Sequence, residues 1–253
     1  MKMHDAVKDR LIVALDVESA QEAREMFARL RDHAGMFKIG SQLFTAAGPG
    51  IVRELVAAGA SVFLDLKFHD IPNTVASAGV EATRLGVSMF NVHALGGGEM
   101  MRRTMEAVME ASAREGINRP VVIAVTVLTS ADSTTLAEVG IPSGPEAIVP
   151  RLARLAEECG LDGVVASPRE VALVRASVRK ADFLIVTPGV RPLGAAANDQ
   201  KRIVTPAEAV LAGANYLVMG RVILKAEDPQ RAAIKVVEEM AQALALKTQS
   251  SGL

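Results

Sequence analysis

The chain has 253 residues, of which 50% are hydrophobic and 23% charged, and its formal net charge at pH 7 is −1. This length and composition predict a globular protein with one substantial core. The balanced charge and the scarcity of aromatic residues exclude the basic, base-stacking surface that a nucleic-acid partner needs. The apolar run after residue 10 is far too short for a membrane span. The single cysteine, Cys159, cannot form an intrachain disulfide, so we expect a cytoplasmic small-molecule enzyme.

Short apolar runs alternate with longer amphipathic segments along the chain. The apolar runs predict strands at residues 11–15, 36–39, 61–64, 88–92, 121–125, 163–166, 183–186 and 216–219. The amphipathic segments predict helices at residues 20–31, 51–58, 74–84, 99–114, 146–158, 168–178, 206–211 and 229–244. This repeated alternation predicts an α/β fold, a (β/α)8 TIM barrel, as a single domain over residues 1–253. Residues 1–10 would be an N-terminal extension and residues 246–253 a flexible tail.

An open, doubly wound sheet also alternates strands with helices. The even spacing of the units disfavours it, and the turn after the first predicted strand lacks the G-x-G-x-x-G pattern of dinucleotide-binding folds. Glycines that precede the predicted strands indicate left-handed helix caps at Gly35, Gly59, Gly86, Gly160 and Gly213.

The third predicted strand ends in a cluster of charges. Asp65 and Lys67 are two residues apart, so in a regular strand they would project to the same side, and Asp70 follows in the next loop. Nearby carboxylates favour the charged form of the lysine, which makes it a proton donor rather than a nucleophile. The alternative is a solvated turn with an ordinary surface ion pair. The position at a strand end favours an active site.

Polar residues also follow other predicted strands, where a barrel would gather them at one face. Gly220 and Arg221, after the last strand, predict a phosphate site built from backbone N–H groups and a guanidinium. The long connection over residues 188–205 is a candidate lid, with a plain surface loop as the alternative. We interpret His93 as a structural core histidine.

Four segments carry a resemblance to a known family. They are Phe37-Lys38-Ile39-Gly40, Asp65-x-Lys67-x-x-Asp70-Ile71-Pro72-Asn73-Thr74, Thr187-Pro188-Gly189-Val190-Arg191 and Met219-Gly220-Arg221. With these, the chain closely resembles the orotidine 5′-phosphate decarboxylase family, nearly end to end. The resemblance implies conversion of orotidine 5′-monophosphate to uridine 5′-monophosphate and CO₂ in de novo pyrimidine synthesis. It further implies a (β/α)8 homodimer with shared active sites and no metal or organic cofactor.

The resemblance also implies roles for individual residues. The charged catalytic network would comprise Lys38, Asp65, Lys67 and Asp70. Residues contributed to the partner subunit's site would be Asp70, Ile71 and Thr74. The ribose would be held by Asp16 and Lys38, the pyrimidine by Thr129 or Ser130, and the phosphate by Arg191, Gly220 and Arg221, with Pro188 beside them. Gln200 would bridge base and phosphate under the lid.

The chemistry is consistent with these roles. Loss of CO₂ from a ring carbon without an electron sink leaves a carbanion, which a cofactor-free protein can stabilise only electrostatically. An ammonium at Lys67 can do so and then donate the proton. Three alternatives stay open: a magnesium-dependent sugar-phosphate decarboxylase or aldolase of the same superfamily, a Schiff-base aldolase with Lys67 as nucleophile, and a non-catalytic nucleotide-binding barrel. The first has an acidic metal ligand where this chain has Lys38.

Overall fold

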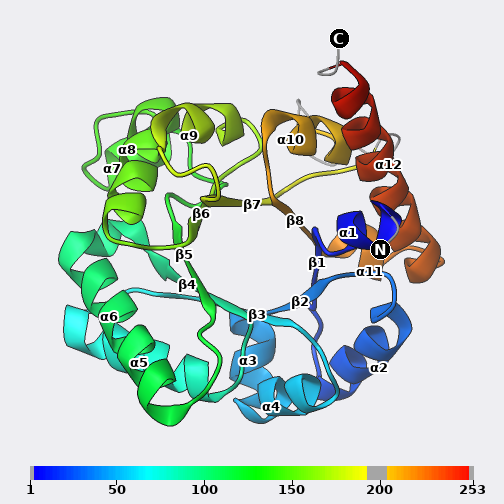
Figure 1. Cartoon of the computed structure of the whole chain (residues 1–253), viewed down its shortest axis with the longest axis horizontal. Coiled ribbons are helices and arrows are strands. Elements are labelled where there is room, and N and C mark those ends of the chain that lie inside the picture. The colour runs from blue at the N-terminus through cyan, green and yellow to red at the C-terminus, as the bar shows by residue number, and fades with distance from the viewer. Residues whose placement is uncertain (1–2, 193–203, 251–253) are drawn as a thin grey trace. The chain divides into compact units, whose positions relative to one another are not determined.

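The computed structural model describes residues 3–192 and 204–250. Eight strands close into a barrel in chain order, and their recorded pairings are parallel (Figure 1). The strands are β1 (Leu11–Ala14), β2 (Met36–Gly40), β3 (Val62–Phe68), β4 (Met89–His93), β5 (Val121–Val125), β6 (Gly163–Val165), β7 (Leu184–Pro188) and β8 (Tyr216–Met219). The predicted (β/α)8 fold is therefore confirmed, and every predicted strand overlaps an observed one.

Among the described residues, helices and one 3-10 turn, η1 (Ala94–Gly96), connect the strands or flank the barrel at the two ends of the chain. The helices are α1 (Met3–Lys8), α2 (Ala20–Leu30), α3 (Ser41–Ala47), α4 (Gly50–Ala57), α5 (Pro72–Arg84), α6 (Gly97–Glu115), α7 (Ser133–Glu138), α8 (Pro145–Glu158), α9 (Val171–Ser177), α10 (Pro206–Ala212), α11 (Arg221–Leu224) and α12 (Pro229–Ser250). All predicted helices are found. The periodicity did not indicate α1, α3 and α7, which have only six or seven residues each.

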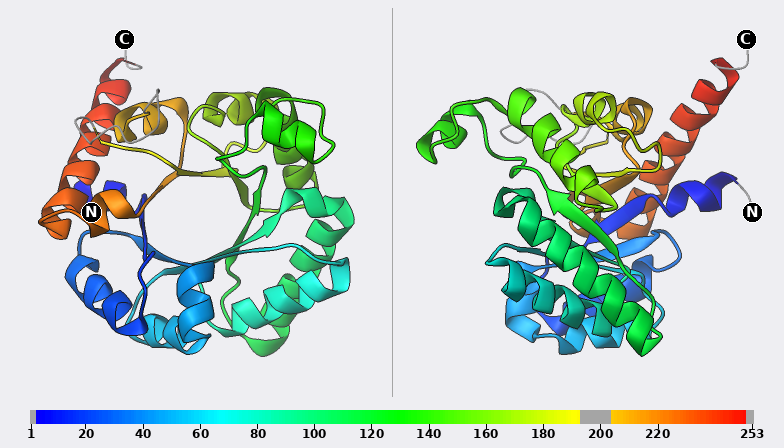
Figure 2. Two further views of the ribbon diagram at one scale, coloured as in Figure 1. Left: turned by 180° about the vertical axis from the view of Figure 1, so that it is seen from behind. Right: turned by 60° about the vertical axis from the view of Figure 1, so that its left-hand side comes forward.

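The chain forms two compact units. The terminal unit comprises residues 1–62 and 187–253, and the central unit comprises residues 63–186. In the terminal unit, β1 pairs with β2 on one side and with β8 on the other, and all its residues are buried. Helix α12 packs against both α10 and α1, so segments from the two ends of the chain lie together in this unit (Figure 2).

In the central unit, β4 pairs with β3 and β5, and helices α5 and α6 pack side by side (Figure 1). Gly79 permits this helix contact, because a Cβ there would lie 3.1 Å from Thr104 Cγ2 and 3.2 Å from the Phe90 ring. Helix α7 projects away from the strands of the same unit (Figure 2). A larger residue at position 79 would crowd Thr104 of α6 and Phe90 of β4.

Some sequence-based expectations are corrected. Gly59, Gly86, Gly160 and Gly213 have the predicted positive φ, but Gly35 does not. Gly35 is needed for a different reason, since a Cβ there would fall on the backbone of Asp9. Helix α12 continues to Ser250 instead of ending at residue 244, because the alanine, leucine, lysine and glutamine that follow are good helix formers.

One further property concerns membranes. Over residues 3–192 and 204–250, no helix has both the length and the apolar character needed to cross a bilayer.

Candidate active site

The predicted charge cluster lies at the end of β3, where the strand is irregular. The register of β3 against β4 shifts between Leu64 and Phe68, so that three residues of β3 face Asn91 alone. Lys67 lies within this bulge and has a φ of 54°, the one positive φ among the described residues other than glycine. Because this left-handed conformation costs an L-residue about 1–2 kcal/mol, specific interactions are needed to hold it.

Asn91 provides such interactions. Its Oδ1 accepts a hydrogen bond from the backbone N–H of Lys67 at 2.8 Å, and its Nδ2 donates to Asp65 Oδ1 at 2.7 Å. The same oxygen of Asp65 accepts from Lys67 Nζ at 2.6 Å. Asn91 is 1% exposed and Asp65 9%, so water competes little for these bonds. The predicted pairing of Asp65 with Lys67 is present, although in a bulge rather than in a regular strand.

Asn91 is absent from the sequence-based candidates. A signal for it existed, since an amide in the middle of the apolar run 88–92 would be costly to bury without hydrogen-bond partners. A buried polar residue in a strand that ends beside charged groups indicates a role in the site.

The segment after β3 leaves the cluster. Asp70 is exposed, and its Oδ1 accepts a hydrogen bond from the backbone N–H of Ile71 at 2.6 Å. Within the described part of the chain, Asp70 forms no ion pair with Lys67. Ile71 is 66% exposed, and Thr74, in the first turn of α5, is also exposed. These predicted site residues thus point to solvent within their own chain.

Two histidines lie close to Lys67. The rings of His69 and His93 stack with centroids 5.3 Å apart. Burial is the main cause that lowers the pKa of His93 to about 4, and electrostatic interaction with His69 and Lys67 contributes to the same shift. His93 Nδ1 also accepts a hydrogen bond from the backbone N–H of Leu95 at 3.4 Å. His93 is therefore neutral at pH 7 and adds no second cation beside the lysine.

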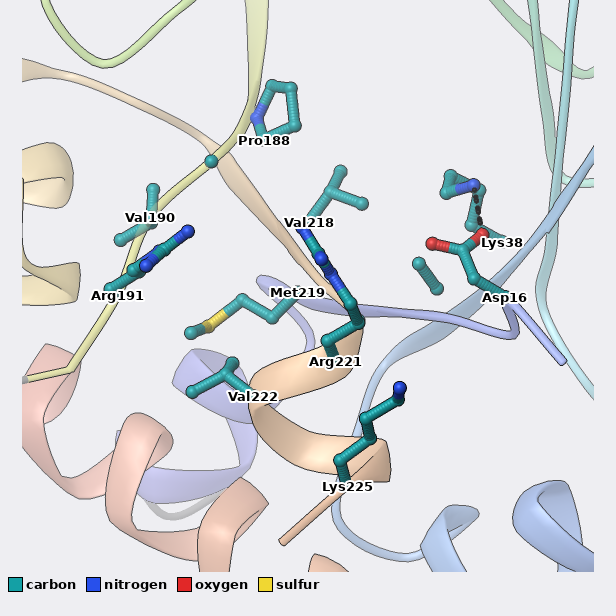
Figure 3. A pocket seen from close by; sticks show the side chains of 13 residues that line it. Asp16, Lys38, Pro188, Val190, Arg191, Val218, Met219, Arg221, Val222 and Lys225 are labelled. Carbon is teal, nitrogen blue, oxygen red and sulfur yellow. Dashed lines mark hydrogen bonds and ion pairs between the residues drawn. The ribbon is translucent and has the colours of Figure 1, made fainter. Parts of the chain in front are cut away.

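The terminal unit contains a pocket of about 560 Å³ (Figure 3). It is lined by Ala14, Asp16, Lys38, Pro188, Gly189, Val190, Arg191, Val218, Met219, Gly220, Arg221, Val222 and Lys225. Most substrate-binding residues predicted in this unit are among them, and the exception, Gln200, lies outside the described residues. Most of the predicted lid also lies outside them.

Cationic side chains surround this pocket. Figure 3 shows Arg191 on one side and Arg221 with Lys225 on the other. Arg221 is the first residue of α11, and Gly220 before it leaves little room for a side chain, because a Cβ there would lie 3.2 Å from Asp16 Oδ2. Such a pocket suits an anion. Lys225 was missed, although it lies one helical turn after Arg221.

At the other edge of the pocket, Lys38 Nζ forms an ion pair with Asp16 Oδ1 at 3.2 Å (Figure 3). The side chain of Lys38 is 10% exposed, whereas that of Asp16 is 48% exposed. A Cβ at Gly40 would lie 2.9 Å from Lys38 Nζ, so the glycine leaves space for the amine. Asp16 can therefore offer its free oxygen to a polar ligand while it fixes Lys38.

The remaining candidates lie after β5. Thr129 and Ser130 are both exposed in a turn, and nothing in their surroundings distinguishes them as contacts for a ring.

The fold and these two groups of residues define a class of protein. A (β/α)8 barrel with a cationic, glycine-bordered pocket after β7 and β8 is typical of enzymes that act on phosphate esters. The lysine held against a buried carboxylate has the geometry that a positioned general acid requires.

Comparison with known proteins places the chain within that class. Residues 9–236 match the family described as orotidine 5′-phosphate decarboxylase / HUMPS, and the chain belongs to this family. It is 57% identical over 237 residues to an orotidine 5′-phosphate decarboxylase of Syntrophotalea carbinolica, covering 94% of this chain and 97% of that protein. It is 55% identical over 236 residues to the Geobacter sulfurreducens protein of the same name, covering 93% and 98%.

A solved structure shows the same similarity. The crystal structure of orotidine 5′-phosphate decarboxylase from Lactobacillus acidophilus superimposes with a TM-score of 0.80 at 35% identity, over 91% of this chain and 98% of that one. The resemblance inferred from the four sequence segments is confirmed.

Proposed function

We propose that this chain decarboxylates orotidine 5′-monophosphate to uridine 5′-monophosphate and CO₂, as a step of pyrimidine biosynthesis in the cytoplasm. The observation that carries the proposal is the ion pair of Lys67 with buried Asp65, at 2.6 Å, at the end of a barrel strand. Relatives at 51–57% identity, all named orotidine 5′-phosphate decarboxylase, support the choice of substrate.

Lys67 is the proposed acid. When the bond to the carboxylate carbon breaks, its electron pair stays on the ring carbon, and the ammonium of Lys67 stabilises that charge. The ammonium then donates a proton to the same carbon, and the amine is reprotonated from water. Asp65 keeps Nζ in place throughout, since its buried Oδ1 accepts the lysine hydrogen bond.

The pocket of the terminal unit is the proposed phosphate and ribose site. Arg191, Arg221 and the backbone at Gly220 would bind the phosphate, with Pro188 lining the same pocket. Asp16 and Lys38, already paired at 3.2 Å, would bind the ribose hydroxyls. Binding energy from these remote groups can be used to organise the reacting end of the substrate.

The other assignments concern the base. We assign Thr129 or Ser130 to the pyrimidine edge, and Gln200 to a bridge between base and phosphate. Lys38 would complete the charged network. All of these follow from the family pattern.

We further propose a homodimer in which Asp70, Ile71 and Thr74 of one subunit complete the site of the other. Two observations support this. Within the described part of its own chain, Asp70 forms no ion pair with Lys67. Ile71, the next residue, is 66% exposed, so its apolar side chain is accessible to a partner subunit.

The proposal is tested by adding orotidine 5′-monophosphate to the purified protein and following the loss of its absorbance, with uridine 5′-monophosphate quantified as product. Equimolar product is expected, and Lys67→Ala protein serves as the control for contaminating enzymes. No turnover by the wild-type protein would contradict the proposal. Turnover abolished by a chelator would favour the magnesium-dependent alternative, and borohydride trapping of a carbonyl substrate on Lys67 would favour the Schiff-base alternative.

A further inference from the structure

We infer that Asn91 is a positioning residue of this enzyme, whose single amide fixes both the backbone and the ammonium of Lys67. The inference rests on the proposed function, because it assigns Asn91 to the step in which Lys67 donates its proton. Three features of the central unit support it: the bulge in β3, the orientation of the Asn91 amide and the burial of that amide.

The first feature is the backbone of Lys67. Its φ of 54° is unfavourable for a residue with a side chain, and it occurs where β3 loses register with β4. At that point Asn91 Oδ1 accepts the N–H of Lys67 at 2.8 Å. The side chain of Asn91 thus stabilises a conformation that the regular strand does not provide.

The second feature is the orientation of the amide. Asn91 Nδ2 donates to Asp65 Oδ1 at 2.7 Å, and the same oxygen receives Lys67 Nζ at 2.6 Å. A rotated amide would place NH₂ against the N–H of Lys67 and an oxygen against the Asp65 carboxylate, so only one orientation is stable. Asn91 therefore links the backbone of Lys67 to the Asp65 carboxylate, which in turn binds the ammonium of Lys67.

The third feature is burial. Asn91 is 1% exposed, so it cannot contact a substrate in this structure and acts only through Lys67 and Asp65. Its removal should therefore affect the chemical step rather than the binding of substrate.

Two substitutions test this. Asn91→Ala removes both hydrogen bonds, and we expect kcat to fall on the order of 100-fold, the size of effect that a displacement of about 1 Å can have. The dissociation constant for uridine 5′-monophosphate, measured by calorimetry, should stay within about twofold, because the phosphate pocket is untouched. Thr83→Val is the matched control: it also removes a buried hydrogen bond of the central unit, from Thr83 Oγ1 to Gly79 O at 2.8 Å, and should leave kcat unchanged.

Asn91→Asp keeps the shape of the side chain and the acceptor for the Lys67 N–H, but it places a second carboxyl against Asp65. Two adjacent carboxylates resist ionising together, so a proton shared between them restores a donor at low pH. We expect the rate of this variant relative to wild type to rise as the pH falls from about 8 to about 6. The rate of Asn91→Ala relative to wild type should not show this rise.

The outcomes separate the inference from the proposed function. If wild-type protein does not decarboxylate orotidine 5′-monophosphate, the proposed function fails. If wild type turns over and folded Asn91→Ala keeps kcat within about threefold, or loses product affinity as strongly as kcat, the inference alone is overturned. Loss of folding in both variants, seen by circular dichroism, would also overturn it, because Asn91 would then be a structural residue.

Discussion

The two units of the molecule hold their charged residues in different ways. In the central unit, Lys67, Asp65 and Asn91 are joined by hydrogen bonds of 2.6 to 2.8 Å without any ligand. In the terminal unit, Arg221 and Lys225 line a pocket of about 560 Å³, and no ion pair is recorded for either within the described ranges. Groups that perform chemistry gain from being fixed in advance, whereas groups that bind an anion are satisfied by the anion itself.

The comparison predicts that the Lys67 cluster of the central unit governs kcat and that the cationic residues Arg221 and Lys225 of the terminal unit govern binding of the phosphate. The largest expected effect is that of Lys67→Ala, which should lower kcat by at least about 10³-fold, because the positioned proton donor is removed. Stopped-flow or long-time assays would measure kcat, and calorimetry would measure uridine 5′-monophosphate binding, which should be retained. Lys235→Ala, on the exposed face of α12, controls for the loss of a positive charge. If the Lys67→Ala variant kept a tenth of the wild-type rate, Lys67 could not be the proton donor.

Arg221→Ala tests whether the pocket of the terminal unit governs substrate binding. It should weaken substrate binding by about 10- to 100-fold, the worth of one charged hydrogen-bonding partner. Uridine, which lacks the phosphate, should bind wild type and variant almost equally. Arg53→Ala, an exposed arginine of α4 in the same unit, is the control. Equal losses of affinity for nucleotide and nucleoside would place Arg221 away from the phosphate.

A third experiment asks whether the central cluster is complete within one chain. If Asp70 serves the partner's site, co-expressed Lys67→Ala and Asp70→Ala chains should regain about a quarter of wild-type activity, because half of randomly paired dimers are mixed and half of their sites are intact. If Asp70 serves its own chain, every site in a mixed dimer carries a lesion and the mixture stays inactive. Tagged chains would verify that mixed dimers had formed.

The smallest expected effect concerns His93. Its pKa in the folded protein is about 4, against an ordinary value of 6.5, because burial disfavours the charged form. The unfolded chain therefore takes up this proton first, so stability is fully present above pH 6.5 and is lost as the pH falls toward 4. His93→Gln should reduce this loss, measured as the change in Tm across the window. If the pH dependence of Tm in His93→Gln matched that of wild type and of His33→Gln, His93 would not be the group whose protonation destabilises the folded protein.

Much of the barrel could be predicted, because each strand is a short apolar run bounded by glycines or polar residues. The positions of Asp65, Lys67 and Arg221 at strand ends predict their place in a site, whereas the role of Lys38 follows only from the family resemblance. The bulge at the end of β3 could not be predicted, since alternation along one strand carries no information on its register against β4. Asn91 depends on that register, which is why its two hydrogen bonds became visible only in the structure.

The pairing of β1 also has a consequence for how the chain is made. Leu11 lies opposite Leu217 of β8, near the other end of the chain, and the backbone N–H of Leu217 donates to Arg10 O at 2.9 Å. During synthesis on the ribosome, one edge of β1 therefore stays unpaired until β8 has emerged, while residues 63–186 are already complete. An exposed strand edge invites pairing with other chains. The nascent protein therefore carries an open strand edge at β1, a site for aggregation, until β8 has been synthesised.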